Sequence, residues 1–151
     1  MIIGVGNSDT RIEKKSEIQD YLAKLKYALT NSNTRLEFQR ERRSDYEKNK
    51  EVTNKFTVDT LFPDEIPSKA FRRELQKLKL TNYIKTVKDR RYPDLSEMRV
   101  FGKSYSKKDV YIKIRVNLIN LQKASGGNFV LVMSFHFAQW DFTEEDFPYR
   151  K

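Results

Sequence analysis

The only histidine of the chain, His136, lies near the end of a long apolar segment, NFVLVMSFHFAQWDF. Because alternate side chains of an extended strand point to opposite sides, Ser134 and His136 are predicted to share one face. The same alternation puts Val130 and Val132 on that face. An imidazole titrates near neutrality and is suited to proton transfer. A histidine at the end of a strand is also commonly a structural residue, and both interpretations stay open at this point.

A second segment, DVYIKIRVNLI, alternates between apolar and polar residues and is predicted to be a strand. Its polar face carries Tyr111, Lys113 and Arg115. The sequence QKASGGN then supplies a turn, so the two strands are expected to form a hairpin. If they pair, this polar face lies beside Ser134 and His136, giving a basic surface with hydroxyl groups and one imidazole.

Such a surface has the groups that metal-free cleavage of RNA requires. The reaction needs a base for the ribose 2′-hydroxyl, an acid for the 5′-oxygen and cations for the charged phosphorane. Metal-dependent cleavage would need clustered carboxylates or histidines. The acidic run DFTEEDF has no evident second cluster, and we interpret it as surface charge or a docking segment. We therefore expect no metal ion and no cofactor.

Composition indicates one basic domain. The chain has 151 residues, with 30 Lys and Arg against 21 Asp and Glu, which gives a net charge of +9. A sequence pI near 9.6 is typical of proteins that bind nucleic acid. The absence of cysteine excludes disulfides, thiolate metal sites and cysteine nucleophiles. Neither a signal peptide nor an apolar run long enough to span a membrane is evident, so a cytoplasmic location without membrane contact is expected.

The first half of the chain is predicted to contain a helix, a strand and a charged segment. Residues 15–31 have apolar residues at helical spacing, and Ser16 with Gln19 forms a predicted capping box. Leu36 and Phe38 alternate with polar residues, as in a strand. Residues 40–55 form a mixed-charge run, interpreted as a solvated surface element or flexible loop. Its arginines at 40, 42 and 43 are an alternative set of phosphate contacts, and its role is left open.

The second half is predicted to begin with another helix, which starts at Pro67 and ends between Leu80 and Lys85. The sequence KDRRYPDLSEM indicates a loop, and MRVFGKSY indicates a short strand that stops at Gly102. Together with the hairpin, these elements predict an α+β fold. We expect an antiparallel sheet of about five strands with two or three helices packed on it.

The C-terminal half also resembles a known family. The segments LQKLKLTNYIKTV, LSEMRVFGKS, DVYIKIRV and FVLVMSFHF are similar, in order and spacing, to MqsR-type toxins of toxin-antitoxin systems. The similar region is 66–138, and the quoted segments run from Leu75 to Phe137. The resemblance implies a RelE-like fold and a toxin that cleaves mRNA, free or on the ribosome, as a metal-independent endoribonuclease. It also implies a cognate antitoxin protein as partner.

Carried over residue by residue, the resemblance assigns three catalytic residues. Lys85 in NYIKT matches the family's lysine at a helix end, and Tyr111 in DVYIK matches its tyrosine in the penultimate strand. His136 stands where the family has a lysine in the last strand, and Met98 stands where it has a glutamine. We expect His136 to be a general acid or base, Lys85 to stabilise phosphate or transition-state charge, and Tyr111 to position substrate or transfer a proton.

Three further cations are predicted to contact RNA phosphates: Arg99, Lys113 and Arg115. Two other functions stay open. A noncatalytic RNA- or ribosome-binding protein would use the same basic surface to bind RNA without cutting it. A protein-binding regulator, for example of a mobile element, would contact an acidic partner through the charged loop and have little affinity for RNA at physiological salt.

Overall fold

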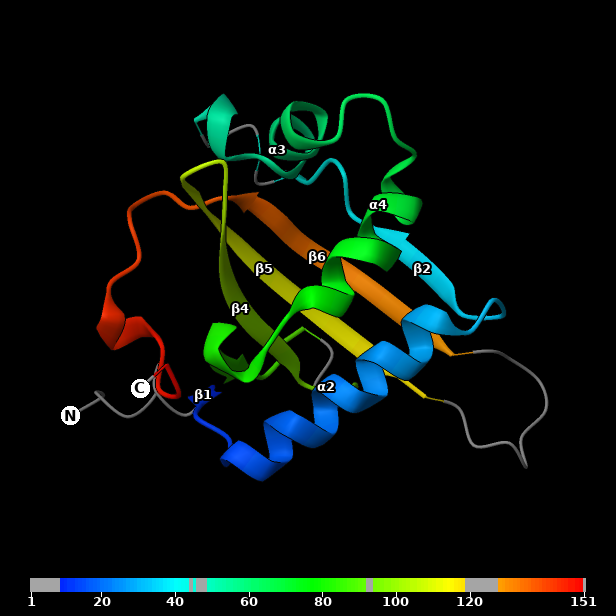
Figure 1. Cartoon of the computed structure of the whole chain (residues 1–151), viewed down its shortest axis with the longest axis vertical. Helices are drawn as coiled ribbons and strands as arrows, with labels where there is room; N and C mark the ends of the chain where they lie inside the picture. The colour runs from blue at the N-terminus through cyan, green and yellow to red at the C-terminus, as the bar shows by residue number, and fades with distance from the viewer. Residues whose placement is uncertain (1–8, 44, 46–48, 92–93, 119–127, 151) are drawn as a thin grey trace.

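A single six-stranded sheet organises the protein (Figure 1). The computed structural model describes residues 9–43, 45, 49–91, 94–118 and 128–150. The strand order is β1-β3-β4-β5-β6-β2, antiparallel throughout except for the parallel pair of β2 and β6. The strands are β1 (Thr10–Arg11), β2 (Arg35–Phe38), β3 (Tyr83–Val87), β4 (Met98–Tyr105), β5 (Lys108–Asn117) and β6 (Phe129–Phe137).

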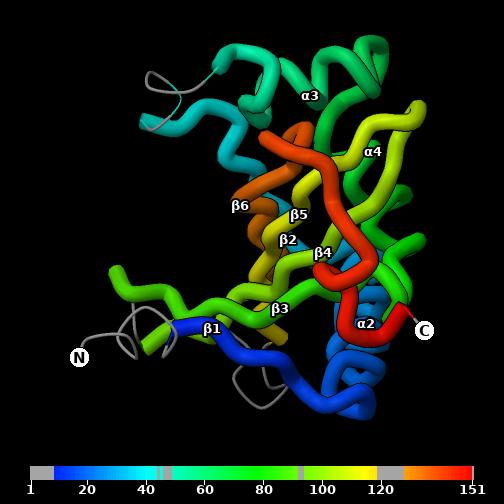
Figure 2. Tube along the Cα trace, turned by 90° about the vertical axis from the view of Figure 1, so that its left-hand side faces the viewer, coloured from blue at the N-terminus to red at the C-terminus, as the bar shows by residue number. Residues whose placement is uncertain are grey.

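Helices cover one face of this sheet. In the part of the chain that the structure describes, the α-helices are α2 (Lys15–Thr30), α3 (Asn54–Leu61) and α4 (Pro67–Glu74). Figure 2 shows α2 and α4 on the same side of the sheet, and α3 lies beside the end of β6. None of these helices is long and apolar enough to cross a membrane. The α+β fold class predicted from the sequence is confirmed.

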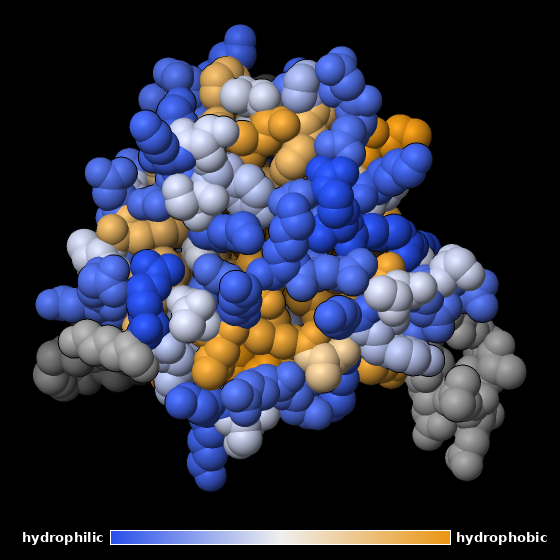
Figure 3. All heavy atoms as spheres, viewed as in Figure 1, coloured by the Kyte–Doolittle hydropathy of each residue, from blue (hydrophilic) through white to orange (hydrophobic). Residues whose placement is uncertain are grey.

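The hydrophobic core lies between the sheet and the helices α2 and α4. Phe71 of α4 packs against Phe135 of β6, with ring centroids 5.1 Å apart. Ile18 and Leu25 of α2 join the same cluster, as does Ile112 of β5. Outside the core, hydrophilic side chains cover most of the helical side of the molecule (Figure 3). The opposite face of the sheet carries the polar side chains of β5 and β6.

Helix α2 agrees with its predicted range, but its cap does not. The helix begins at Lys15, and the side chain of Glu17 accepts a hydrogen bond of 3.0 Å from the backbone N–H of Lys14. The predicted capping box of Ser16 and Gln19 is therefore wrong by two positions. Both Ser16 and Gln19 lie inside the helix.

Strand β6 contains a bulge that changes which residues share a face. Lys113 of β5 pairs with Ser134, whereas the next residue, Ile114, pairs with Val132, so Met133 is an extra residue. Consequently Val132 joins Phe135 on the core side, while Ser134 keeps to the other side. The predicted grouping of the two valines with His136 is wrong for this reason.

Three element boundaries in the middle of the chain also differ from the predictions. Helix α3 begins at Asn54, at the end of the charged segment 40–55, and continues beyond it to Leu61. No helix was predicted there. Helix α4 ends at Glu74, and two short 3-10 turns follow it, at residues 75–77 and 80–82. Lys85 therefore lies in strand β3, and not at the end of a helix. Strand β4 continues through Gly102 to Tyr105.

Candidate functional site

The three residues predicted to be catalytic line one cavity. Lys85 comes from β3, Tyr111 from β5 and His136 from β6, and the cavity has a volume of about 290 Å³. Tyr111 and His136 point to the polar side of the sheet, away from the core, so the cavity opens on the face opposite α2 and α4. The rest of its lining comes from β3 and the C-terminal segment, namely Ile84, Ala138, Gln139, Trp140, Phe142 and Asp146.

Strands β5 and β6 pair as predicted, with Tyr111 opposite His136, and the predicted turn between them lies outside the described residues. The two rings stack with centroids 5.2 Å apart and planes inclined by 17°. The Nδ1 atom of His136 lies 3.0 Å from the carbonyl oxygen of Phe137. A carbonyl only accepts hydrogen bonds, so Nδ1 carries the proton of the neutral ring. This assigns Nε2 as the basic nitrogen of His136.

Tyr111 is held in its protonated form at neutral pH. Burial of the phenol raises its pKa above the ordinary value, and the nearby positive charge of Arg42 opposes this only in part. A phenol in this state is a proton donor and not a base. Together, the phenol of Tyr111 and the basic nitrogen of His136 supply an acid and a base.

Arg42 contributes a cation to this face from the charged segment. Its Nη1 donates a hydrogen bond of 3.4 Å to the hydroxyl of Ser134 on β6. Its neighbour in the predicted phosphate-binding set, Arg40, instead forms an ion pair of 2.7 Å with Asp59 of α3. The sequence pattern included Arg42 among possible phosphate contacts but did not single it out.

The wall of the cavity is the segment that follows β6, which leaves the strand and runs beside the sheet (Figure 1). Asp109 holds this segment at two points. Its carbonyl oxygen accepts a hydrogen bond of 2.8 Å from the N–H of Ala138, and its carboxylate accepts one of 2.9 Å from the N–H of Phe142. The ring of Phe142 lies directly on Gly102 of β4, where a Cβ atom would come within 2.6 Å of the ring.

The three cations predicted to bind RNA have different positions. Lys113 is half-buried on the same face as Tyr111, in register with Ser134. Arg115 is on that face too, but it is buried and forms an ion pair of 2.5 Å with Asp89. Its Nε also donates to the carbonyl of Ser96, so the loop before β4 holds this guanidinium.

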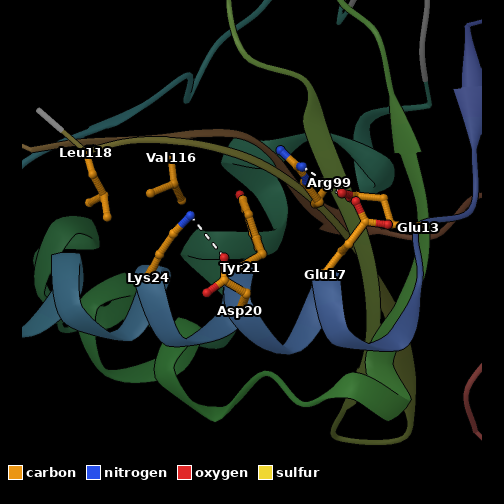
Figure 4. A pocket seen from close by; sticks show the side chains of 8 residues that line it. All are labelled: Glu13, Glu17, Asp20, Tyr21, Lys24, Arg99, Val116 and Leu118. Atoms are coloured by element: carbon orange, nitrogen blue, oxygen red, sulfur yellow. Dashed lines mark hydrogen bonds and ion pairs between the residues drawn. The ribbon is translucent and has the colours of Figure 1, made fainter.

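Arg99 lies on the other face of the sheet and does not join the candidate site. It contributes to a separate cavity between α2 and the sheet, together with Glu13 and Tyr21 (Figure 4). Its guanidinium donates to both carboxylate oxygens of Glu13, at 2.7 and 2.9 Å. It also stacks over the ring of Tyr21, 4.5 Å from the centroid. The expectation that Arg99 shares a basic face with Lys113 is therefore wrong.

Met98 occupies the position where the resembled family has a glutamine, and it offers the site no hydrogen bond. The residue is buried in β4, opposite Val87 of β3. Its neighbour Glu97 is occupied by an ion pair of 2.6 Å with Arg11. The described residues contain no group of three or more His, Asp or Glu side chains placed to hold a metal ion.

Comparisons with protein families, curated proteins and solved structures found no match for this chain.

Proposed function

We propose that the protein is a metal-independent endoribonuclease that cleaves single-stranded mRNA by attack of a ribose 2′-hydroxyl. The observation that carries the proposal is the convergence of Lys85, Tyr111 and His136 on one cavity. These residues come from three different strands and supply a cation, a protonated phenol and an imidazole. The net charge of +9 adds general affinity for a polyanion.

Each residue has a defined role in the proposed step. Nε2 of His136 accepts the proton of the 2′-hydroxyl, whose oxygen attacks the adjacent phosphorus. The bond from phosphorus to the 5′-oxygen breaks, and the phenol of Tyr111 donates a proton to that leaving oxygen. The ammonium of Lys85 stabilises the charged phosphorane. The products are a 2′,3′-cyclic phosphate and a 5′-hydroxyl, and solvent returns the protons to their starting groups.

The biological role proposed with this activity is that of a toxin neutralised by a cognate antitoxin protein. It rests on the sequence resemblance of residues 66–138 to MqsR-type toxins. In this role the natural substrate is mRNA, either free or on the ribosome.

The test is cleavage of a long single-stranded RNA by the purified protein in EDTA, with mapping of the new ends. We expect discrete cuts that leave cyclic phosphate and 5′-hydroxyl ends. Because His136 is buried, both His136→Ala and His136→Gln are to be measured, with thermal unfolding as a check of folding. Both variants are expected to lose cleavage while they remain folded.

A matched pair of lysine variants separates catalysis from general charge. Lys85→Ala is expected to lower the cleavage rate about a hundredfold, because the phosphorane loses its cation. Lys26→Ala removes the same charge from an exposed position on α2, on the far side of the sheet, and is expected to cleave normally. Full cleavage by folded His136→Gln would contradict the proposal. RNA that is bound but stays intact, also with translating ribosomes present, would identify a noncatalytic RNA-binding protein.

A further inference from the structure

An exposed tryptophan stands at the rim of the candidate site. Trp140 is 75% exposed, although it lines the same cavity as Lys85 and His136. It is also the only tryptophan of the chain. A ring of this size in water leaves a large apolar surface unburied, and tryptophan is favoured at binding surfaces that use such a surface. Trp140 is not part of the hydrophobic core cluster.

The backbone on either side of Trp140 is fixed. Asp109 binds the N–H groups of Ala138 and Phe142, two residues before and two residues after the tryptophan. Phe142 is further seated on the backbone at Gly102, and the N–H of Thr143 donates to the carboxylate of Asp146 at 2.7 Å. The indole is therefore presented by a held segment, which lowers the ordering cost of binding a flat partner.

The charges at this cavity and on the same face of the sheet indicate what that partner is. Lys85 provides a cation in the cavity, where the carboxylate of Asp146 is bound by the N–H of Thr143, and Arg42 lies on the same face of the sheet at Ser134. An apolar protein segment offers no anion to Lys85 and Arg42, whereas a nucleotide carries a flat base and a phosphate together. Gln139, adjacent to the tryptophan and lining the cavity, has an amide that matches the donors and acceptors of a base edge.

We propose that Trp140 is the stacking platform for a nucleobase of single-stranded RNA, next to the phosphate held at Lys85. The identity of the ligand as RNA rests on the proposed function, but the stacking itself does not require cleavage. Stacking on an aromatic side chain is tolerant of base identity. Trp140 therefore contributes affinity and register, while Gln139 is the candidate for any base preference.

Because the chain has one tryptophan, fluorescence excited at wavelengths that its eight tyrosines do not absorb reports on this position alone. The probe is a five-nucleotide single-stranded RNA with every 2′-hydroxyl methylated, which removes the nucleophile and prevents cleavage. We expect titration of this oligonucleotide to quench the fluorescence. The matched probe has the same phosphates but abasic sites in place of the bases, and it is expected to bind more weakly and leave the fluorescence unchanged.

Variants are compared by the anisotropy of a labelled oligonucleotide. Trp140→Ala is expected to weaken binding roughly tenfold at fixed salt, and Trp140→Phe by no more than about threefold. The dependence of affinity on salt should be unchanged in Trp140→Ala and reduced in Lys85→Ala, because only the lysine contacts phosphate. Tyr27→Ala removes another exposed aromatic, on α2, and is expected to bind like the wild type.

The outcomes distinguish this inference from the proposed function. Cleavage of RNA without quenching, and with Trp140→Ala binding normally, overturns the platform and leaves the nuclease intact. Quenching by the methylated RNA and a tenfold loss in Trp140→Ala, without cleavage of ordinary RNA either free or with translating ribosomes, supports the platform and overturns the nuclease. Equal quenching by the abasic probe overturns the platform, because no base is then needed. Absence of both quenching and RNA binding overturns it as well.

Discussion

Tyr111 and His136 fix each other's orientation across two neighbouring strands. Their stacked rings, 17° from parallel, leave each side chain few rotamers. The hydrogen bond from His136 Nδ1 to the carbonyl of Phe137 then sets the tautomer. Tyr111 thus has two separable contributions, a ring that supports His136 and a hydroxyl that donates a proton. A substitution that removes only the hydroxyl tests the second.

Tyr111→Phe is expected to retain the stack and lose the proton donor. We expect single-turnover cleavage of RNA to fall by about a hundredfold or more, with RNA affinity within about threefold of the wild type. Tyr27→Phe, which removes a hydroxyl on the other side of the sheet, is the control. Unchanged cleavage by Tyr111→Phe would show that the leaving oxygen takes its proton from another group.

The pH dependence follows from the same pair. Burial raises the pKa of Tyr111 above its ordinary value near 10, so the phenol keeps its proton across the neutral range. Wild-type cleavage is therefore expected not to fall as the pH rises from about 7 to at least about 9, because Tyr111 remains the proton donor. A fall in rate between about pH 7 and 9 would be inconsistent with Tyr111 as the acid.

At the scale of elements, α3 substitutes for a strand along the second half of β6. Strand β2 pairs with β6 only as far as Val132. Beyond it, the Asn54 side chain donates to the carbonyls of Met133 and Gln39, at 2.9 and 2.7 Å, and accepts from the N–H of Phe135. Thr57 accepts from the N–H of Phe137 at 2.8 Å. Helix α3 thereby holds the bulge that places His136 on the polar face.

Asn54→Ala is expected to destabilise the protein by about 2–4 kcal/mol, because it leaves buried backbone groups at the bulge without partners. We also expect RNA cleavage to fall more than the loss of folded protein explains, since the register of His136 depends on the bulge. Urea denaturation and cleavage at a fixed folded fraction measure the two effects. Lys55→Ala, at an exposed position of the same helix, should change the stability by less than about 0.5 kcal/mol. A stability change that small in Asn54→Ala would contradict the role given to α3.

Some elements were predictable from sequence because their patterns are strong. The alternation in β5 identified the strand and the polar face of Tyr111 and Lys113. The bulge in β6 was not predictable, because the first part of the strand, FVLVM, is apolar on both faces and either register satisfies the pattern there. Helix α3 is only eight residues long, and Asn54 and Thr57 tie it to β6 through side-chain hydrogen bonds that the sequence pattern does not reveal.

At the scale of the whole molecule, the strand order brings the candidate site together. Lys85 was expected at the end of a helix, yet it reaches the cavity from β3, on the far side of β4 from Tyr111. The face predicted for Arg99 was wrong because the sequence does not show which residues of β4 point to which side of the sheet. A shift of one residue moves a side chain to the opposite face. Neither the strand order nor the face of each β4 residue can be read from local periodicity.

Because Arg99 lies on the helical face of the sheet, it is part of a junction that joins distant parts of the chain. Its partner Glu13 is 3% exposed and precedes α2. The carboxylate of Glu13 also accepts from the hydroxyl of Thr86 on β3, and its backbone N–H donates to Tyr83. The hydroxyl of Tyr149, near the C-terminus, donates to the carbonyl of Glu13. The ion pair therefore links the entry to α2 with β3, β4 and the C-terminal segment.

The contribution of Glu13 to the free energy of unfolding is expected to depend on pH, and Arg99→Met is expected to reverse the direction of that dependence. Burial alone would raise the pKa of Glu13, but hydrogen bonds from Arg99 and Thr86, together with the charges of Arg99 and Arg11, outweigh burial and lower it. Glu13 therefore stabilises the fold above the pKa of an unfolded glutamate, about 4.3, and this contribution is lost as the pH falls through the lowered folded value.

In Arg99→Met the buried carboxylate of Glu13 loses its main partner, so its pKa rises and it takes up a proton more readily. We expect urea denaturation at pH 7 to show a loss of about 3 kcal/mol in the free energy of unfolding. The difference from the wild type should shrink as the pH falls through the raised pKa of Glu13 in the variant and then through its lowered pKa in the wild type, because Glu13 becomes neutral first in the variant and then in the wild type. Lys24→Met, which breaks the exposed pair with Asp20, should cost less than about 0.5 kcal/mol. A difference that stays constant with pH would mean that Arg99 acts through its packing on Tyr21 and not through the charge of Glu13.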